Sequence, residues 1–165
     1  ELKGLKLHPR FQGFKLYGSE VMSVMRKAAE LKIPVLIDTW IVEDVEHQIL
    51  INTVRDIADE FPSLNIIVPH LGGPNFNNTI RLFGKSNVHF DLSFILRRLD
   101  RETAQQRLLF FIKNIGPRRL IYGSDFPEMN LQKYFEYTQE LLRGINVSSK
   151  NMELIFFKNF CSLFT

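Results

Sequence analysis

The sequence contains a single cysteine, Cys161, and this scarcity limits the kinds of fold it can support. One thiol cannot form an internal disulfide, which fits a reducing compartment. Long apolar runs are also missing, since none reaches the roughly 18 residues that a membrane-spanning helix needs. The N-terminus lacks the apolar core of a signal peptide. From these absences we expect a cytoplasmic protein.

A dominant charge of one sign is also absent. The net charge of the 165 residues is +3, and basic residues occur in scattered pairs such as Arg97-Arg98 and Arg118-Arg119. A nucleic-acid surface normally gathers its basic residues on one face, so we expect no nucleic-acid partner. The chain is 45% hydrophobic and 24% charged, which is typical of one globular domain with a sizeable core.

Five short apolar runs share one plan, because each ends on or near an ionisable residue. These runs are Gly4–His8, Pro34–Asp38, Asn65–His70, Val88–Asp91 and Arg118–Pro127, the last of which carries Asp125. Amphipathic segments separate them at a spacing of about 30 residues, which is the pattern of an α/β fold with a parallel sheet. Ligands bind at the carboxyl ends of such strands. We therefore expect the ionisable residues at the five ends to form one site.

The run that ends on Asp125 organises the others. Leu120–Tyr122 is predicted to be a buried parallel strand, which Gly123 and Pro127 then stop. Because side chains alternate along a strand, Asp125 is expected to share a side with Ile121 and Gly123. The missing side chain at Gly123 would then leave space for a ligand or a metal ion.

Apolar residues at helical spacing predict the helices of the fold. They are expected at Ser19–Lys32, Val45–Phe61, Asn77–Gly84, Glu102–Lys113, Leu131–Leu142 and Asn151–Phe164, with Ser148 or Ser149 capping the last. Arg10–Phe14 is predicted to be a loop, and His47 to lie on the surface. The pair Gly72-Gly73 allows positive φ, so His70 can be held over a tight corner.

Candidate substrate-binding residues lie near the first two strand ends. Lys6 and His8 share a side of their strand, and Trp40 extends the rim after Asp38. Arg10 stands among aromatic residues and is suited to bind a substrate carboxylate. The alternative for Arg10 is an exposed position on an ordinary packed loop.

Six motifs, taken in order, resemble the amidohydrolase 2 family of metal-dependent (β/α)8-barrel hydrolases and decarboxylases. They are Gly4–Pro9, Pro34–Asp38, Pro69–Gly73, His89–Ser93, Tyr122–Pro127 and the closing Lys158–Phe160. The resemblance covers nearly the whole chain but only the second half of the family's barrel. It implies one amidohydrolase-like domain over residues 1–165, built from about five βα units of a partial TIM barrel.

The resemblance also implies roles for individual residues. Asp125 matches the family's last-strand carboxylate, a metal ligand or proton-transfer group, and His70 matches the histidine that polarises substrate or water. Asp38 stands where the family commonly has a metal-binding histidine, and the family's first-strand His-x-His pair is absent. A divalent ion (Zn, Mn or Mg) would be held by Asp125, Asp38 and His70, a set that suits Mg²⁺ or Mn²⁺ better than Zn²⁺. We expect the chain alone to bind such an ion weakly or not at all.

The function implied is a metal-dependent hydrolase acting on a small, carboxylated or cyclic substrate. Two alternatives remain: a decarboxylase of the same family, and a degenerate or truncated barrel with a binding or assembly role. Five βα units leave two open sheet edges, at Leu5–Leu7 and Leu120–Tyr122. We expect a second copy of the chain, or the missing N-terminal half of the barrel, to cover them, with the last helix contributing.

Overall fold

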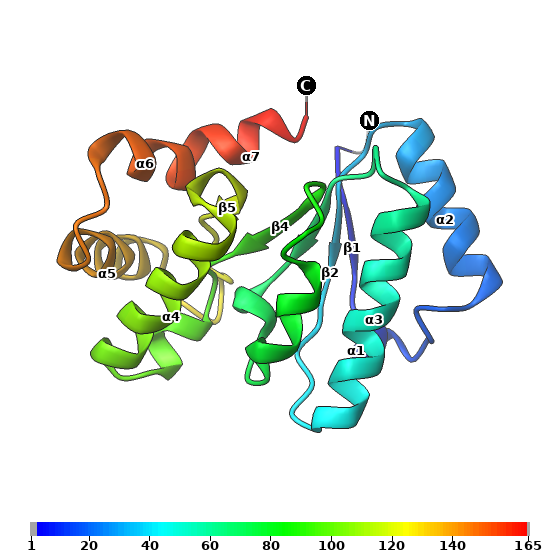
Figure 1. The fold of residues 1–165 in the computed structure, drawn as a ribbon, viewed down its shortest axis with the longest axis horizontal. Helices are drawn as coiled ribbons and strands as arrows, with labels where there is room; N and C mark the ends of the chain where they lie inside the picture. Colours follow the sequence, from blue (N-terminus) through cyan, green and yellow to red (C-terminus); the bar gives the residue numbers. More distant parts are fainter. Residues whose placement is uncertain (1–2, 165) are drawn as a thin grey trace.

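The protein, seen here as a computed structural model that describes residues 3–164, is built on one sheet of five parallel strands (Figure 1). Each strand pairs with the next one along the chain, in the order β1-β2-β3-β4-β5. The strands are β1 Leu5–Leu7, β2 Val35–Ile37, β3 Ile66–Val68, β4 Val88–Asp91 and β5 Leu120–Ile121. This arrangement confirms the predicted α/β fold and brings the five carboxyl ends to one edge of the sheet.

Helices connect the strands close to the predicted positions. The α-helices are α1 Pro9–Gln12, α2 Ser19–Glu30, α3 Asp44–Glu60, α4 Arg101–Ile115, α5 Leu131–Gly144, α6 Ser149–Glu153 and α7 Asn159–Ser162. The 3-10 helices are η1 His70–Gly72, η2 Phe76–Leu82, η3 Ile95–Arg98 and η4 Pro117–Arg119, and η5 Leu154–Lys158 is a π-helix. The predicted helix at residues 77–84 is therefore a 3-10 helix, and the last predicted helix consists of α6, η5 and α7.

The loop predicted at Arg10–Phe14 instead begins as the short helix α1. Pro9 has the fixed φ that a first helical turn requires, and the ring Nδ1 of His8 accepts a hydrogen bond from the backbone N–H of Phe11 at 3.4 Å. Gly13, at φ 69°, ends the helix. The prediction failed because it took the proline only as the end of a strand.

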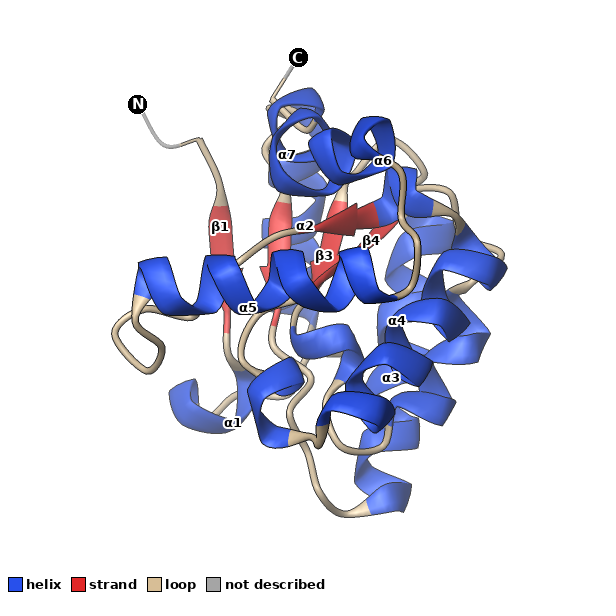
Figure 2. Ribbon diagram, turned by 90° about the vertical axis from the view of Figure 1, so that its left-hand side faces the viewer, coloured by secondary structure: helices blue, strands red, loops and turns tan. Residues whose placement is uncertain are grey.

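The two faces of the sheet are covered unequally. One face packs against the helices through buried side chains of the strands: Val35, Ile37, Ile66, Val68, Val88, Phe90 and Leu120. The opposite face carries Leu36, Ile67 and Ile121, which form a small cluster with Leu163. Leu163 directly follows α7, which lies at the end of the sheet where the strands begin (Figures 1 and 2).

The last helices also cover the outer edge of β5. Tyr122 donates its backbone N–H to the carbonyl of Ile155 in η5 at 2.8 Å. The Asn159 side chain donates to the carbonyls of Pro117 and Leu120, both at 2.7 Å. These bonds satisfy edge groups that would otherwise be open to a foreign strand.

Within residues 3–164, no helix combines the length and the apolar content needed to cross a membrane.

Candidate active site

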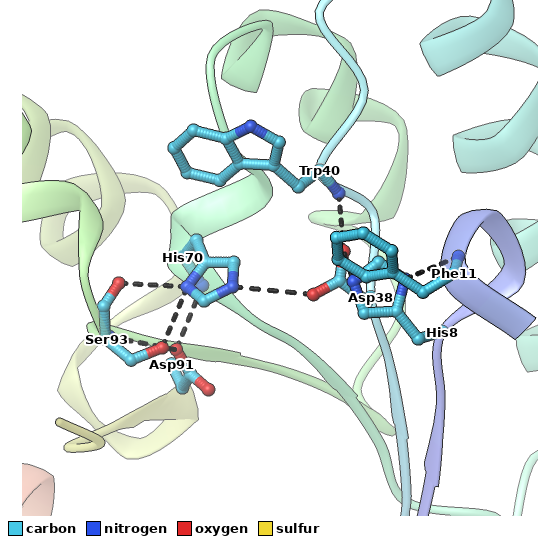
Figure 3. Close-up of polar contacts among 7 residues, drawn as sticks. All are labelled: His8, Phe11, Asp38, Trp40, His70, Asp91 and Ser93. Atoms are coloured by element: carbon cyan, nitrogen blue, oxygen red, sulfur yellow. Dashed lines mark hydrogen bonds and ion pairs between the residues drawn. The ribbon is translucent and has the colours of Figure 1, made fainter. Parts of the chain in front are cut away.

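Residues that follow four neighbouring strands meet at the carboxyl edge of the sheet (Figure 3). His8 follows β1, Asp38 follows β2, His70 lies two residues beyond β3, and Asp91 ends β4. Parallel strands end together, so residues distant in the sequence come within contact distance. The structure thus brings together four of the five strand-end residues that the sequence singled out.

Asp38 is the centre of this group. Its Oδ1 lies 3.5 Å from Nε2 of His8, and its Oδ2 lies 3.5 Å from Nε2 of His70. The backbone N–H of Trp40 donates to Oδ1 at 2.9 Å. Burial raises the pKa of the Asp38 carboxyl, but the contact with His70, the hydrogen bond from the Trp40 N–H and the charges that the two imidazoles carry when protonated outweigh it, so the pKa is lowered. Asp38 is therefore a buried carboxylate between two histidines.

The other ring nitrogen of His70, Nδ1, faces Ser93. It lies 3.1 Å from the Ser93 carbonyl oxygen and 2.9 Å from Ser93 Oγ. Ser93 Oγ donates its one proton to Oδ1 of Asp91 at 2.5 Å, so towards His70 it only accepts. Both Ser93 oxygens thus accept from His70, which places the proton on Nδ1. The nitrogen that can exchange a proton with a ligand is Nε2, on the Asp38 side.

The same contacts set the charge of His70. Burial lowers the pKa of the imidazole, but Asp38, Asp91 and the Ser93 carbonyl outweigh it, so the pKa is raised. Asp91 also holds the backbone here, because its Oδ1 accepts from the N–H groups of His70 and Ser93, both at 2.9 Å. Sequence reasoning missed the role of Ser93. The available signal was that Asp91 and Ser93 lie two residues apart on one side of a strand end.

Unusual backbone conformations concentrate at these strand ends. Positive φ angles occur at His70 (59°), Leu71 (48°), Phe94 (61°) and Asp125 (61°), beyond β3, β4 and β5. The two other non-glycine residues with positive φ among those described, Lys32 and Asn146, follow the ends of α2 and α5. Such conformations each cost on the order of 1–3 kcal/mol and are typical of functional sites. The strain therefore coincides with the edge that carries the buried histidine.

The corner that holds His70 depends on two glycines, as predicted. Gly72 and Gly73 have φ of 78° and 73°. A Cβ at Gly72 would lie 2.1 Å from Cγ2 of Thr79, so no other residue fits without a shift. Arg107 of α4 donates from Nη1 to the carbonyl of Gly73 at 3.0 Å. The corner is thus held by contacts with both η2 and α4.

His47 was predicted to lie on the surface, and this prediction is wrong. The side chain is fully buried, and its Nδ1 lies 3.1 Å from the Asn78 amide nitrogen, which donates to it. Burial lowers the pKa of His47, so it stays neutral. His47 lies three residues before Leu50 and seven before Val54, so it shares the buried face of α3, and its place near the start of the helix did not keep it exposed.

Two aromatic rings stand against His70. Trp40 lies edge-on to it with ring centroids 5.4 Å apart, and Phe94 does so at 5.9 Å. Trp40 and Phe94 also contact each other at 5.3 Å. Edge-to-face contacts of this kind restrict ring motion. The imidazole is therefore held on its faces by rings and at its nitrogens by Ser93 and Asp38.

A cavity of about 520 Å³ opens beside Asp38, between the loop after β1 and the start of α3. Its lining includes Arg10, Phe14, Tyr17, Trp40, Val42 and Ile49. Tyr17, Val42 and Ile49 each expose more than half of their surface, at 59%, 69% and 53%. The volume lies in the range of small-molecule sites. Two of the predicted substrate-binding residues, Arg10 and Trp40, line this cavity. Lys6, a third, does not line it: its side chain is exposed, and it lies within β1, paired with Leu36 of β2.

The Asp125 side chain makes no hydrogen bond or ion pair with His8, Asp38, His70 or Asp91. Strand β5 ends at Ile121, so the argument from alternating side chains does not reach Asp125, which is half-buried. Within residues 3–164, no three His, Cys, Asp or Glu side chains are arranged to hold a metal ion. Nε2 of His8 and Nε2 of His70 each lie 3.5 Å from Asp38, but the three side chains are not arranged around one ion, and a catalytic zinc takes about three protein ligands. The residues described do not complete a metal site, and the ligand roles of Asp125, Asp38 and His70 remain predictions.

Several solved structures share this fold. A candidate 2-pyrone-4,6-dicarboxylic acid hydrolase from Pseudomonas putida superposes with a TM-score of 0.69 at 19% identity, over 99% of this chain and 63% of the other. An uncharacterised TIM-barrel protein from Bordetella bronchiseptica gives 0.74 at 17%, over 91% and 52%. A dihydroxybenzoic acid decarboxylase from Polaromonas, with bound manganese and the inhibitor 2-nitroresorcinol, gives 0.68 at 16%, over 92% and 55%. The likeness confirms a partial TIM barrel.

The chain spans only about half to two thirds of the length of these proteins. No curated protein sequence matches it. The sequence pattern of the amidohydrolase family (Amidohydro_2), however, matches residues 1–159. That match covers nearly all of the chain and agrees with the resemblance seen in the strand-end motifs. The protein therefore belongs to the amidohydrolase family.

Proposed function

We propose that this chain supplies the proton-transfer pair of a hydrolase that acts on a small, cyclic carboxylate. One observation carries the proposal: His70 has its proton fixed on Nδ1 by Ser93, which leaves Nε2 facing the buried Asp38 carboxylate. An imidazole nitrogen that is left unprotonated within reach of a ligand is a candidate general base, and the carboxylate beside Nε2 makes that nitrogen more basic. The strained backbone around it and the adjoining cavity support the same assignment.

The spacing of the pair suits the activation of water. Nε2 of His70 and Oδ2 of Asp38 lie 3.5 Å apart, which is long for a direct hydrogen bond and leaves both atoms able to contact one water molecule. In the proposed reaction Nε2 removes a proton from that water as its oxygen attacks the substrate carbonyl. Asp38 then stabilises the imidazolium that forms, and His70 returns the proton to the leaving oxygen.

The cavity supplies the proposed substrate site. Tyr17, Val42 and Ile49 offer apolar surface for the body of a ring, and Arg10 in α1 supplies a positive charge for a carboxylate. The names of the similar structures refer to a pyrone dicarboxylic acid and to a dihydroxybenzoic acid, both cyclic carboxylates. A bound metal ion would find His70 Nε2 and Asp38 on this chain, and no step above depends on it.

Substrate turnover by the protein tests the proposal. Cyclic lactone carboxylates and hydroxybenzoates are incubated with the wild type, and hydrolysis is followed by acid release and decarboxylation by CO₂ release. His70→Gln and Asp38→Asn should each lower the rate by at least about a hundredfold, whereas Lys150→Ala, an exposed site on α6, should not. CO₂ release without hydrolysis would establish the decarboxylase alternative. Wild-type turnover by His70→Gln would refute both.

An assembly role is the second candidate, favoured by the outer edge of β1. Among the described strands, β1 pairs only with β2, whereas the edge of β5 is covered by the last helices. Leu5 donates its N–H to Pro34, so the alternating N–H of Lys6 points to the open edge. A second copy of the chain is the proposed partner. Sedimentation should then give a dimer that Lys6→Pro dissociates, because proline removes only the outward N–H.

A further inference from the structure

The geometry points to Phe94 as a positioning residue for His70. We infer that a strained turn at Phe94 aims the Ser93 carbonyl at His70 Nδ1 and so decides which imidazole nitrogen faces a ligand. The effect of Phe94 on catalysis rests on the proposed function, whereas its effect on the tautomer of His70 does not.

The turn itself is unusual. Phe94 has φ 61° and ψ −55°, and Ile95 donates its N–H to the carbonyl of Ser93 at 2.6 Å. A hydrogen bond between residues two apart, with these angles at the middle residue, is a γ-turn of the rare, strained kind. For a bulky residue such as phenylalanine, this region of φ and ψ is a genuine outlier. Glycine would adopt it with little cost.

The strained turn sets the direction of one carbonyl. The Ser93 oxygen that accepts from Ile95 also lies 3.1 Å from His70 Nδ1. If Phe94 relaxed to a negative φ, the peptide between Ser93 and Phe94 would rotate and this carbonyl would turn away. His70 Nδ1 would then keep only the Ser93 hydroxyl as a partner.

The Phe94 ring explains why glycine does not occupy the position. Its edge-on contacts with His70 and Trp40 place it in the wall of the site. The Arg98 guanidinium lies over the Phe94 ring, 4.7 Å from the ring centroid. These contacts hold the ring, and with it the backbone, where the turn requires it. The bulk of the Phe94 side chain disfavours this backbone conformation, but the contacts of its ring stabilise it. The same ring packs against His70.

Nitrogen NMR of histidine-labelled protein tests the inference. The His70 signals are identified by their loss in His70→Gln, and spectra are recorded above the raised pKa of His70 so that the ring is neutral. The wild type should show a proton fixed on Nδ1. Phe94→Gly should still fold, since glycine accepts these angles, but without the ring contacts nothing holds residue 94 in the turn, so the His70 signals should show an average of the two tautomers. Phe94→Tyr should keep the wild-type spectrum.

Two further variants serve as controls. Lys32→Gly relieves a positive φ of 53° at the end of α2, far along the chain from His70, and should leave the His70 signals unchanged. Ser93→Ala removes the hydroxyl but keeps the carbonyl, so the proton should stay on Nδ1. If Ser93→Ala lost the Nδ1 proton while Phe94→Gly kept it, the hydroxyl and not the turn would hold His70, and the inference would be overturned.

Activity provides an independent measurement. With a substrate identified as above, Phe94→Gly should lower kcat by roughly tenfold to a hundredfold with a smaller effect on KM, as expected when a catalytic group loses its orientation. If no substrate is turned over by the wild type, the proposed function fails while the NMR comparison still decides the inference. Wild-type kcat and an unchanged spectrum in Phe94→Gly would overturn it.

Discussion

Asp38 and His70 face each other across the ends of neighbouring strands, with Oδ2 and Nε2 3.5 Å apart and both side chains almost excluded from solvent. Each partner changes the other's protonation, because the pKa of Asp38 is lowered and that of His70 is raised despite the burial of both. The two segments are brought together by the parallel pairing of β2 and β3. Their charge states therefore depend on the fold.

Replacing Asp38 by asparagine should lower the pKa of His70, since burial would then act without the carboxylate that opposes it. An NMR titration of the ring measures this shift. In the wild type, the lowered pKa of Asp38 stabilises the fold above about pH 3.8, and the raised pKa of His70 does so below about pH 6.5. Between these values Asp38→Asn should cost about 3 kcal/mol.

An exposed ion pair provides the matched control for Asp38→Asn. Lys27 and Glu30 lie 3.0 Å apart on α2, and both are solvent-exposed. Glu30→Gln should therefore change the free energy of unfolding by less than about 0.5 kcal/mol. An equal loss of stability in the two variants would show that the buried pair contributes no more than a surface contact.

Gly72→Ala should destabilise the protein by about 3 kcal/mol, measured by urea denaturation. The new Cβ would meet Cγ2 of Thr79 at 2.1 Å, and φ at this position is 78°. Gly84→Ala is the control, because a Cβ there has no neighbour within 4 Å. Thr79→Ser removes the clashing methyl group, so the double variant should be more stable than the sum of the single effects predicts.

His89 should make the protein less stable as the pH falls from about 6.5 towards 4. Burial, followed by the charge of Arg119, lowers the pKa of the folded state to about 4, whereas the unfolded chain takes up the proton near 6.5. The unfolded state thus binds more protons over this range. His89→Gln should remove up to about 3 kcal/mol of this loss of stability. The effect should be smaller than this limit, because water screens the charge at the half-buried ring. Parallel pH profiles of the two proteins would contradict this.

Asn159→Ala should cost about 2 kcal/mol in thermal unfolding, because two carbonyls, of Pro117 and Leu120, lose their donor at the edge of β5. Asn114→Ala is the control, since its single bond to the Phe110 carbonyl lies in an exposed helical turn. That variant should lose no more than about 0.5 kcal/mol. We also expect Asn159→Ala to aggregate more readily on heating, as its strand edge opens.

The isolated chain should retain well under one divalent ion per molecule after dialysis, because no three His, Cys, Asp or Glu side chains within residues 3–164 are arranged to hold one. Elemental analysis measures the content. A stoichiometric zinc that resists a chelator would mean that the ligands, including the place of Asp125, have been misassigned.

The elements of the fold and their order could be read from the sequence because they rest on local patterns. Apolar runs and helical periodicity depend on neighbouring residues, so the five strands and the helices lie close to their predicted positions. The meeting of Asp38 with His70 also followed, since parallel strands end at one edge. The corner at Gly72-Gly73 was predictable because positive φ favours glycine whatever packs around it.

Tertiary contacts decided what the local pattern could not. The spacing of His47 to Leu50 already places it on the buried face of α3, but its hydrogen-bond partner, Asn78 of η2, lies 31 residues along the chain. The proton on His70 Nδ1 is set by Ser93, 23 residues away. Strand β5 ends at Ile121, so Asp125 lies beyond the regular strand. Burial, protonation and backbone strain depend on groups brought together only by folding, which a pattern along the sequence does not contain.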